Sequence, residues 1–420
     1  MIREKNYFWL VTFSVLIIAV GLLIGVFIQR PTPEASDQYR KLVEKLLDEV
    51  APSVEELRGL TLPEGFEFKD VTAQWVRENW GTRYFEAISE EVEDEERIYK
   101  SLFLIPEGFS LKEAYVGISS MTMAAVLDNT LYVVREYFNP LDNESKRTLV
   151  HELTHIMQGE HFRVPEVSTF DEKQAWNALI EGDSDLTASV YIETMRSHLT
   201  WRRPVSIMNL DSAVAEDIAS HNGGLSSVRR LRMFPYKYGK DFVEALYQRG
   251  GFDEVNNAYL NPPQSTEQVM HHNKYVLGER ATSVKMPGLG LEGWDLERTD
   301  RLGEYFILVM LDTWLPDTFA QRVAEDWEGD NLTYYERGED WLLTWGVKWD
   351  SEVDALEFHE SFTEVLMRVG GQASERRDVN RIWKVSWGYV LISVKSNETF
   401  IAGSTDREAL FEAYKIKVAH

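Results

Sequence analysis

Residues 151–155 read His-Glu-Leu-Thr-His, and this stretch decides which fold and which site the chain can build. Helical residues four apart lie on one face, so the two imidazoles can hold a single metal ion. Glu152 projects from the neighbouring position and can reach a water molecule at the metal's open coordination site. Residues 142–145 supply capping side chains, and apolar residues recur through 148–157. The pattern predicts a helix that carries a catalytic zinc site, against the alternative of a surface helix with two histidines by chance.

The composition narrows the classes of function. The chain has 420 residues, of which 44% are hydrophobic and 12% aromatic, enough for two or three domains with their own cores. Its formal net charge of −25 repels phosphate backbones, so nucleic acid is not an expected partner. There is no cysteine, which excludes thiolate zinc sites and cysteine nucleophiles. Any metal must therefore be bound by His, Asp, Glu or backbone oxygens.

An apolar run without charges covers residues 7–28, long enough to cross a bilayer as a helix. Residues 28–31, Ile-Gln-Arg-Pro, are unlike a signal-peptide cleavage site, so the run is predicted to remain as an anchor. Arg3 and Lys5 before it favour a cytoplasmic N-terminus. We expect a single-pass protein of the cell membrane, with residues 1–6 cytoplasmic and the catalytic domain extracellular.

The rest of the chain predicts an α+β fold. Residues 29–56 form a juxtamembrane linker and an amphipathic helix that needs a surface to pack on. Residues 131–134 are the clearest strand, placed where zinc peptidases carry an exposed edge strand that aligns an extended substrate. A glycine-rich segment at 287–293 is a plausible boundary. We expect a transmembrane helix, a zincin-like catalytic domain at 57–286 with the HExxH helix, and a separate C-terminal α+β domain at 294–420.

Alternating aromatic residues mark two strands of the C-terminal half. Trp341, Trp345 and Trp349 share one face of a strand, and residues 383–389 repeat the pattern. An exposed face of this kind can stack on cell-wall sugars. The favoured interpretation is a face covered by the helix predicted at 351–369, which needs no ligand.

Two residues compete for the third metal ligand. His161 falls where metzincins place their third histidine, but Gln158 occupies the position at which that pattern has glycine. Glu181 lies four residues before Asp185, so both project from one helix face. Glu181 can then bind the metal while Asp185 accepts a hydrogen bond from the outer nitrogen of a ligand histidine. We favour Glu181, with His161 as the alternative.

HExxH followed by Glu-x-x-x-Asp resembles the gluzincin clan of zinc metallopeptidases, which includes thermolysin-like enzymes and the archaeal minigluzincins. The resemblance covers residues 57–280. The Pro-Pro-Gln-Ser-Thr-Glu-Gln segment at 262–268, with the His, Lys and Tyr that follow, is similar to that of membrane-anchored prokaryotic gluzincins. The resemblance implies that His271 or Tyr275 donates to the oxyanion of the tetrahedral intermediate, with His271 preferred to His272. A structural turn and helix cap is the alternative for this segment.

The sequence thus predicts a membrane-anchored zinc metallopeptidase that acts on a peptide or protein substrate. Its Zn²⁺ ligands are His151, His155 and Glu181, its general base is Glu152, and Asp185 supports a ligand from outside. The alternatives are a catalytically inert zinc-containing scaffold, a protein that binds peptides or cell wall, and a peptidase-like chaperone. The sequence carries no signal for an oligomeric state.

Overall fold

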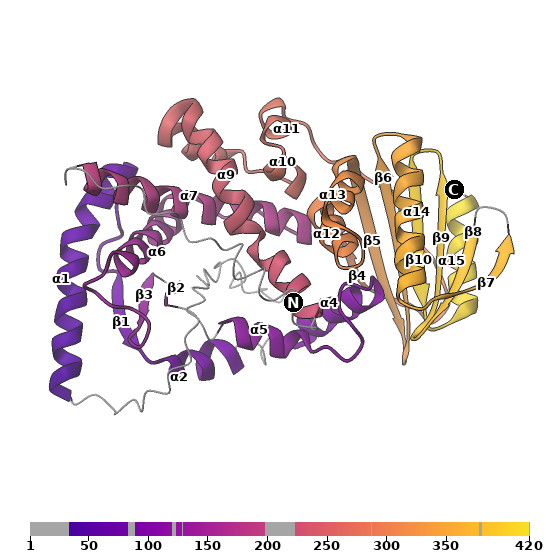
Figure 1. Ribbon diagram of the computed structural model, residues 1–420, viewed down its shortest axis with the longest axis horizontal. Helices are drawn as coiled ribbons and strands as arrows, with labels where there is room; N and C mark the ends of the chain where they lie inside the picture. Colours follow the sequence, from indigo (N-terminus) through magenta and orange to yellow (C-terminus); the bar gives the residue numbers. More distant parts are fainter. Residues whose placement is uncertain are drawn as a thin grey trace, which may run out of the picture.

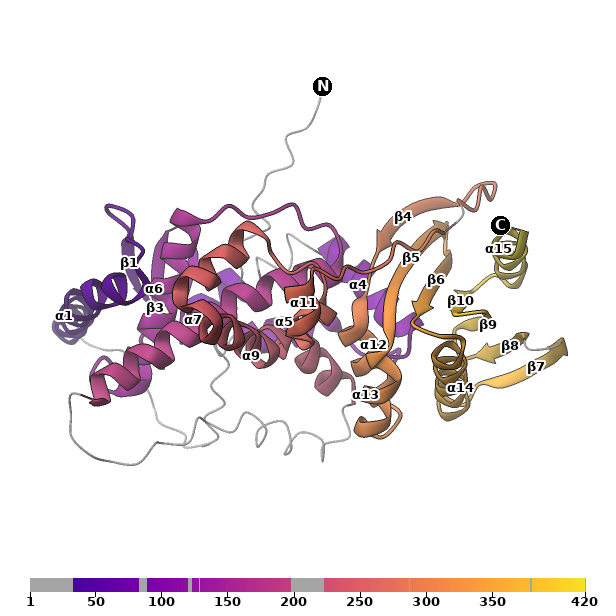
Figure 2. The same cartoon turned by 90° about the horizontal axis from the view of Figure 1, so that it is seen from above.

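The computed structural model describes residues 33–82, 89–119, 123–127, 129–197, 223–286, 288–377 and 380–419. A small three-stranded sheet lies at one end of the molecule and a seven-stranded sheet at the other, with a layer of helices between them (Figures 1 and 2). The predicted α+β class is confirmed in this respect, because helices and sheets both contribute to the core.

The elements of the first part follow the chain from the predicted amphipathic helix to the segment around His271. They are α1 (Pro33–Arg58), β1 (Glu67–Val71), α2 (Ala73–Val76), the π-helical turn η2 (Arg77–Thr82), α4 (Ser89–Ser101), α5 (Leu111–Ser119), β2 (Ala124–Leu127), β3 (Thr130–Val134), α6 (Asn143–His161), α7 (Phe170–Ser197), α9 (Gly223–Leu260), α10 (Thr266–Met270) and α11 (His272–Leu277).

The small sheet has the strand order β1-β3-β2, with β1 parallel and β2 antiparallel to β3. The strand predicted at 131–134 is β3, but the prediction that it lies exposed at an edge is wrong. Leu131, Val133 and Val134 are fully buried, as expected for a central strand covered on both faces. The edge beside α6 is β2 instead.

The HExxH helix is α6. The Asp142 side chain accepts a hydrogen bond from the Ser145 amide at 2.7 Å and so caps the helix, as the sequence predicts. α1 packs along one side of α6 through a shared hydrophobic cluster, and α7 packs on the other side. The amphipathic helix predicted before residue 56 therefore finds its surface on α6. This cover explains why α6 is buried from 148 to 158 on every face.

α7 and α9 approach each other closely at two glycines. A Cβ atom on Gly182 would lie 2.1 Å from the carbonyl oxygen of Gly239, and one on Gly239 would lie 2.2 Å from that of Ala178. Only glycine fits at these positions, because the backbones are already in contact. Gly182 follows the predicted ligand Glu181, so the crossing brings α9 close to that residue.

The second part contains the larger sheet and the helices that cover it. Its elements are β4 (Asp295–Asp300), α12 (Gly303–Asp312), α13 (Asp317–Glu325), β5 (Trp327–Arg337), β6 (Asp340–Trp349), α14 (Glu352–Arg368), β7 (Gln372–Arg377), β8 (Asn380–Val385), β9 (Gly388–Lys395), β10 (Glu398–Ser404) and α15 (Arg407–Ala419). The sheet is antiparallel, in the order β4-β5-β6-β10-β9-β8-β7, with α14 on one face and α15 on the other (Figure 1).

The alternating tryptophans of β6 belong to the core. Trp345 and Trp349 are fully buried and contact Phe358 of α14, with ring centroids 6.1 and 4.7 Å apart. The predicted cover by a helix is therefore confirmed, and this face offers no platform for sugars.

The predicted division into a catalytic domain and a C-terminal domain stays a prediction. The larger sheet starts at Asp295, close to the boundary at 287–293. However, one hydrophobic cluster holds side chains from both parts. The rings of Phe234 in α9 and Tyr305 in α12, for example, lie 4.5 Å apart. The two parts therefore share a continuous packed interior.

The membrane placement needs correction. The predicted transmembrane helix, residues 7–28, lies outside the described residues, and among those the structure describes no helix is long and apolar enough to cross a membrane. The strongly apolar α12, for example, has 10 residues. At about 1.5 Å per residue it spans about half of a hydrocarbon core of about 30 Å. We therefore withdraw the transmembrane helix from the fold class, the membrane as a partner, and the single-pass location.

The glycine crossing predicts a sharp contrast between two glycines. Gly182→Ala should lower the free energy of unfolding by about 1–3 kcal/mol, because the added methyl overpacks the α7–α9 contact. Gly159→Ala on exposed α6 surface meets no atom within 4 Å and should be neutral or stabilising by up to about 1 kcal/mol. Urea unfolding of both variants measures the difference. Equal stability of the two proteins would contradict this account of the crossing.

Candidate metal centre

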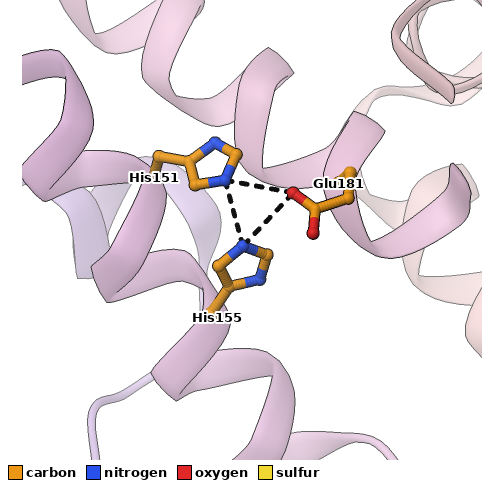
Figure 3. A group of neighbouring side chains, drawn as sticks. All are labelled: His151, His155 and Glu181. Carbon is orange, nitrogen blue, oxygen red and sulfur yellow. Dashed lines mark hydrogen bonds and ion pairs between the residues drawn. The ribbon is translucent and has the colours of Figure 1, made fainter. Parts of the chain in front are cut away.

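α6 and α7 bring His151, His155 and Glu181 together in a buried cluster (Figure 3). The two Nε2 atoms lie 3.0 Å apart. The Glu181 Oε2 atom lies 3.2 Å from His151 Nε2 and 3.5 Å from His155 Nε2. The histidines are one turn apart on α6, and Glu181 reaches them from the adjacent helix.

The spacing of these three atoms fits a metal ion. Ligand atoms of a tetrahedral site with bonds of about 2.1 Å lie about 3.4 Å apart, close to the distances in this cluster. Glu181 Oε2 is buried and has no hydrogen-bond partner of normal geometry, which is costly unless a cation compensates it. His151, His155 and Glu181 can therefore hold a metal ion, with two nitrogen donors and one oxygen donor.

The outer nitrogens of both histidines face acceptors. Asp185 Oδ1 lies 3.3 Å from His151 Nδ1 and accepts a hydrogen bond from Arg147 at 2.8 Å. His155 Nδ1 lies 2.8 Å from the side-chain oxygen of Gln158. A donor proton on each Nδ1 leaves the lone pair of each Nε2 directed at the cluster, the form that binds a metal.

The electrostatics of the cluster favour paired charges. Burial lowers the pKa of His151, but Asp185 and Glu181 outweigh it and raise that pKa to about 10. Burial also acts to raise the pKa of Glu181, whereas the two imidazoles lower it to about 2. The cluster therefore stabilises a positive charge next to Glu181. A metal cation would bind at the same place.

Glu152 lies in the same buried region without a firm partner. The side chain is fully buried, and neither carboxylate oxygen has a hydrogen-bond partner of normal geometry. Burial raises the pKa of Glu152 to about 7, although the two histidines and the backbone amide of Val126 in β2 act to lower it. A carboxyl group with this pKa can accept and return a proton near neutral pH.

The alternative ligand His161 has a different environment. Its Nε2 atom lies 2.8 Å from the Thr61 carbonyl oxygen and 3.1 Å from the Thr61 amide nitrogen, at the exposed end of α6. The structure thus brings Glu181 to the two histidines and leaves His161 with the loop that follows α1.

The predicted oxyanion donors have partners elsewhere. His271 Nε2 lies 2.9 Å from a carboxylate oxygen of Glu304 in α12, and the Tyr275 hydroxyl donates to the Asn261 carbonyl oxygen at 2.9 Å. His272 is exposed. Figure 1 shows α10 and α11 apart from α6, with α7 and α9 between them. The donor role of these residues stays a prediction.

Sequence reasoning missed Tyr236 of α9. Tyr236 lies three residues before Gly239, and therefore on the face of α9 that contacts α7. Burial raises the pKa of Tyr236 well above 10, and the charges of Glu181, Glu152 and Asp185 add to the shift. No motif marks this tyrosine, because only the α7–α9 crossing brings it near the cluster.

Comparisons with known proteins add little to this geometry. The family model described as a Domain of unknown function (DUF8575) matches residues 293–414, which contain all seven strands of the larger sheet, the helices α12 to α14 and the first part of α15. No curated protein matches the chain. A crystal structure from Chloroflexus aurantiacus, described as a candidate hydrolase with a novel fold, aligns with 59% of this chain and 92% of its own at 16% identity. Its TM-score is 0.34, so this likeness carries no argument.

The geometry predicts which residue a metal ion needs. Glu181→Ala should weaken binding of a divalent metal by about a hundredfold or more, beyond the 10–100-fold typical for loss of a supporting partner. His161→Ala should bind it as the unchanged protein does. Metal content of the purified proteins after dialysis measures both. A loaded Glu181→Ala protein together with a metal-free His161→Ala protein would exclude this cluster as the site.

Proposed function

We propose that the protein is a zinc-dependent metallopeptidase that hydrolyses peptide bonds. The observation that carries the proposal is the buried carboxylate of Glu152, which has no hydrogen-bond partner of normal geometry and follows directly on His151, one of three residues that can hold a metal ion. Membership of the gluzincin clan is part of the proposal and rests on the order HExxH and then Glu-x-x-x-Asp along the chain.

The choice between a catalytic and a structural metal site turns on Glu152. A structural zinc site is closed by four protein ligands, whereas a catalytic site has three and keeps one position open. A buried carboxylate without hydrogen-bond donors destabilises the fold, and groups of this kind are concentrated at functional sites. An inert scaffold or a peptide-binding chaperone does not need it, so hydrolysis is the better explanation.

The residues have distinct roles in this mechanism. Zinc, when bound by His151, His155 and Glu181, supplies a Lewis acid that activates water and polarises a carbonyl group. Glu152 takes the proton of the attacking water and returns it to the leaving amine. Burial raises the pKa of Glu152 to about 7 in the metal-free protein, and a proton affinity raised towards the working pH lets one group act first as base and then as acid.

The edge strand β2 is the proposed place for the substrate. Among the residues that the structure describes, β2 pairs with β3 alone, and the Val126 amide within it lies close enough to Glu152 to lower the pKa of that carboxyl group. An extended peptide that pairs with the edge of β2 opposite β3 would bring its backbone past the base. The substrate is therefore a peptide or an unfolded segment of a protein.

Tyr236 is the proposed donor to the developing oxyanion. Its hydroxyl is protonated at neutral pH, as in any tyrosine of ordinary pKa, and burial together with the charges of Glu181 and Glu152 raises the pKa of Tyr236 further. A neutral donor aimed at the developing charge stabilises the transition state more than the ground state. His271 is the rival from the sequence pattern.

Glu152→Gln tests the base. The amide keeps the shape of the side chain but cannot accept a proton, so kcat should fall at least about a hundredfold, as expected when general-base catalysis is lost. Zinc content should stay unchanged because Glu152 is not a ligand. Turnover of a broad peptide mixture, normalised to bound zinc, measures the effect. Activity above a few per cent of the unchanged protein would contradict the mechanism.

Tyr236→Phe and His271→Ala separate the two candidate donors. Tyr236→Phe removes one hydroxyl and should lower kcat by about 10²–10³, with zinc content unchanged. His271→Ala should leave kcat unchanged and lower the unfolding free energy, because it removes the partner of Glu304, which is 1% exposed. Steady-state kinetics and thermal unfolding measure both. The opposite pattern, with kcat lost only in His271→Ala, would return the role to His271.

A further inference from the structure

The outer nitrogen of His155 has two polar neighbours, the nearer being Gln158 on the same helix and the other the Ser184 hydroxyl of α7, at 3.2 Å. His155 Nδ1 lies 2.8 Å from Gln158 Oε1, and Gln158 is 5% exposed. The Gln158 amide nitrogen donates to the Ile180 carbonyl oxygen and to Asp183 Oδ2, each at 3.0 Å, and to Ser184 at 3.2 Å. One side chain therefore connects the ligand histidine of α6 to three groups of α7.

These contacts fix the orientation of the glutamine. A flipped amide would place its oxygen against the Ile180 carbonyl and the Asp183 carboxylate, which are both acceptors. Gln158 Oε1 must then face His155, and His155 Nδ1 must carry the proton. The lone pair of His155 Nε2 is left for the metal ion.

Asp183 is in turn held by Arg58, the last residue of α1. The Arg58 Nε and Nη2 atoms donate to the two Asp183 oxygens at 3.0 Å each, and both side chains are fully buried. Tyr259 adds a hydrogen bond to Asp183 at 2.8 Å, and Asn256 accepts from Arg58 at 2.7 Å. A two-point contact fixes the plane of the carboxylate more firmly than a single charge can.

α1 is held in place by apolar contacts, so its docking positions Arg58. Five of its side chains lie in the cluster shared with α6, and at most 8% of any of them is exposed: Val43, Leu46, Leu47, Val50 and Val54. If α1 did not pack against α6, Asp183 would lose the guanidinium group of Arg58. Gln158 would then donate to a carboxylate whose orientation is no longer fixed. The contacts thus run without a break from α1 to a metal ligand.

We propose that Arg58, Asp183 and Gln158 form a positioning relay that sets the proton position on His155 and makes metal affinity depend on the docking of α1. This inference rests on the proposed metal site. Arg58, Asp183 and Gln158 are positioning residues, because they act on the metal only through His155. Coupling is reciprocal, so metal binding also stabilises docked α1.

Gln158→Met tests the relay by zinc affinity. Methionine fills a similar volume but has no amide donor and only a weak sulfur acceptor, so the zinc dissociation constant should rise about 10–100-fold. Thr154→Val is the matched control, because Thr154 is buried on α6 and its hydroxyl donates within the helix to the Val150 carbonyl oxygen. Its affinity should be unchanged. Competition between the full-length proteins and a chromophoric zinc chelator measures both constants.

The ring proton of His155 gives a readout that general destabilisation does not move. The ¹⁵N spectrum of the zinc-free protein should assign a proton to Nδ1 of His155. In Gln158→Met the Ser184 hydroxyl remains beside Nδ1, and because a hydroxyl can donate as well as accept, the proton should be shared between Nδ1 and Nε2. An unchanged proton position in Gln158→Met would overturn the relay, whatever the affinity does.

Arg58→Lys tests the link to α1 with the charge retained. Lysine offers one donor point in place of two, so zinc affinity should fall severalfold, and added zinc should protect α1 amides from hydrogen exchange less than in the unchanged protein. Unchanged affinity and unchanged protection would overturn the coupling. If the unchanged protein binds no zinc, the proposed function fails, while the ring-proton experiment still decides the relay.

Discussion

Three buried carboxylates occupy alternate positions along one stretch of α7, and the packing of the neighbouring helices depends on which group pairs with each of them. Glu181, Asp183 and Asp185 are 2%, 0% and 9% exposed. Buried charges destabilise a fold unless they are paired and hydrogen-bonded. Helical geometry puts Glu181 and Asp185 on one side and Asp183 on the other. The first two therefore face the α6 histidines, whereas Asp183 meets Arg58.

The need to pair these buried carboxylates explains why helices that are distant in sequence meet at α7. α6 supplies imidazoles to one side of α7, and α1 supplies a guanidinium group to the other. α9 can come close only because Gly182 and Gly239 leave room for backbone contact. Packing and charge compensation thus act on the same short stretch, and a change to either affects the geometry of the candidate metal centre.

Asp330 shows how the fold treats a buried carboxylate that has a purely structural task. It accepts from the backbone amides of Leu302 and Gly303 at 2.9 and 2.8 Å, and from the indole nitrogens of Trp345 and Trp327 at 3.0 and 3.1 Å. Burial still raises its pKa to about 6, but its oxygens are satisfied. Glu152, equally buried, has no such set of donors. That contrast is the physical basis for assigning Glu152 a chemical role.

The sequence alone determined the local part of this site. His151, Glu152 and His155 follow from helical spacing, and so does the pairing of Glu181 with Asp185, because residues one turn apart must share a face. It also indicated the α+β class and the helix that covers the tryptophan face, since the period of apolar residues depends on local structure.

Only the tertiary structure decided the rest. Leu131–Val134 forms a central strand rather than an edge, because strand order depends on β1 and β2 as much as on β3 itself. Arg58 reaches Asp183 across 125 residues, and Tyr236 comes near Glu181 through a helix crossing that no local pattern announces. The apolar run at 7–28 met the length rule for a membrane helix, but among the described residues no helix is long and apolar enough to cross a membrane. Contacts between distant segments depend on how whole elements pack, and a single sequence records the faces of those elements but not their partners.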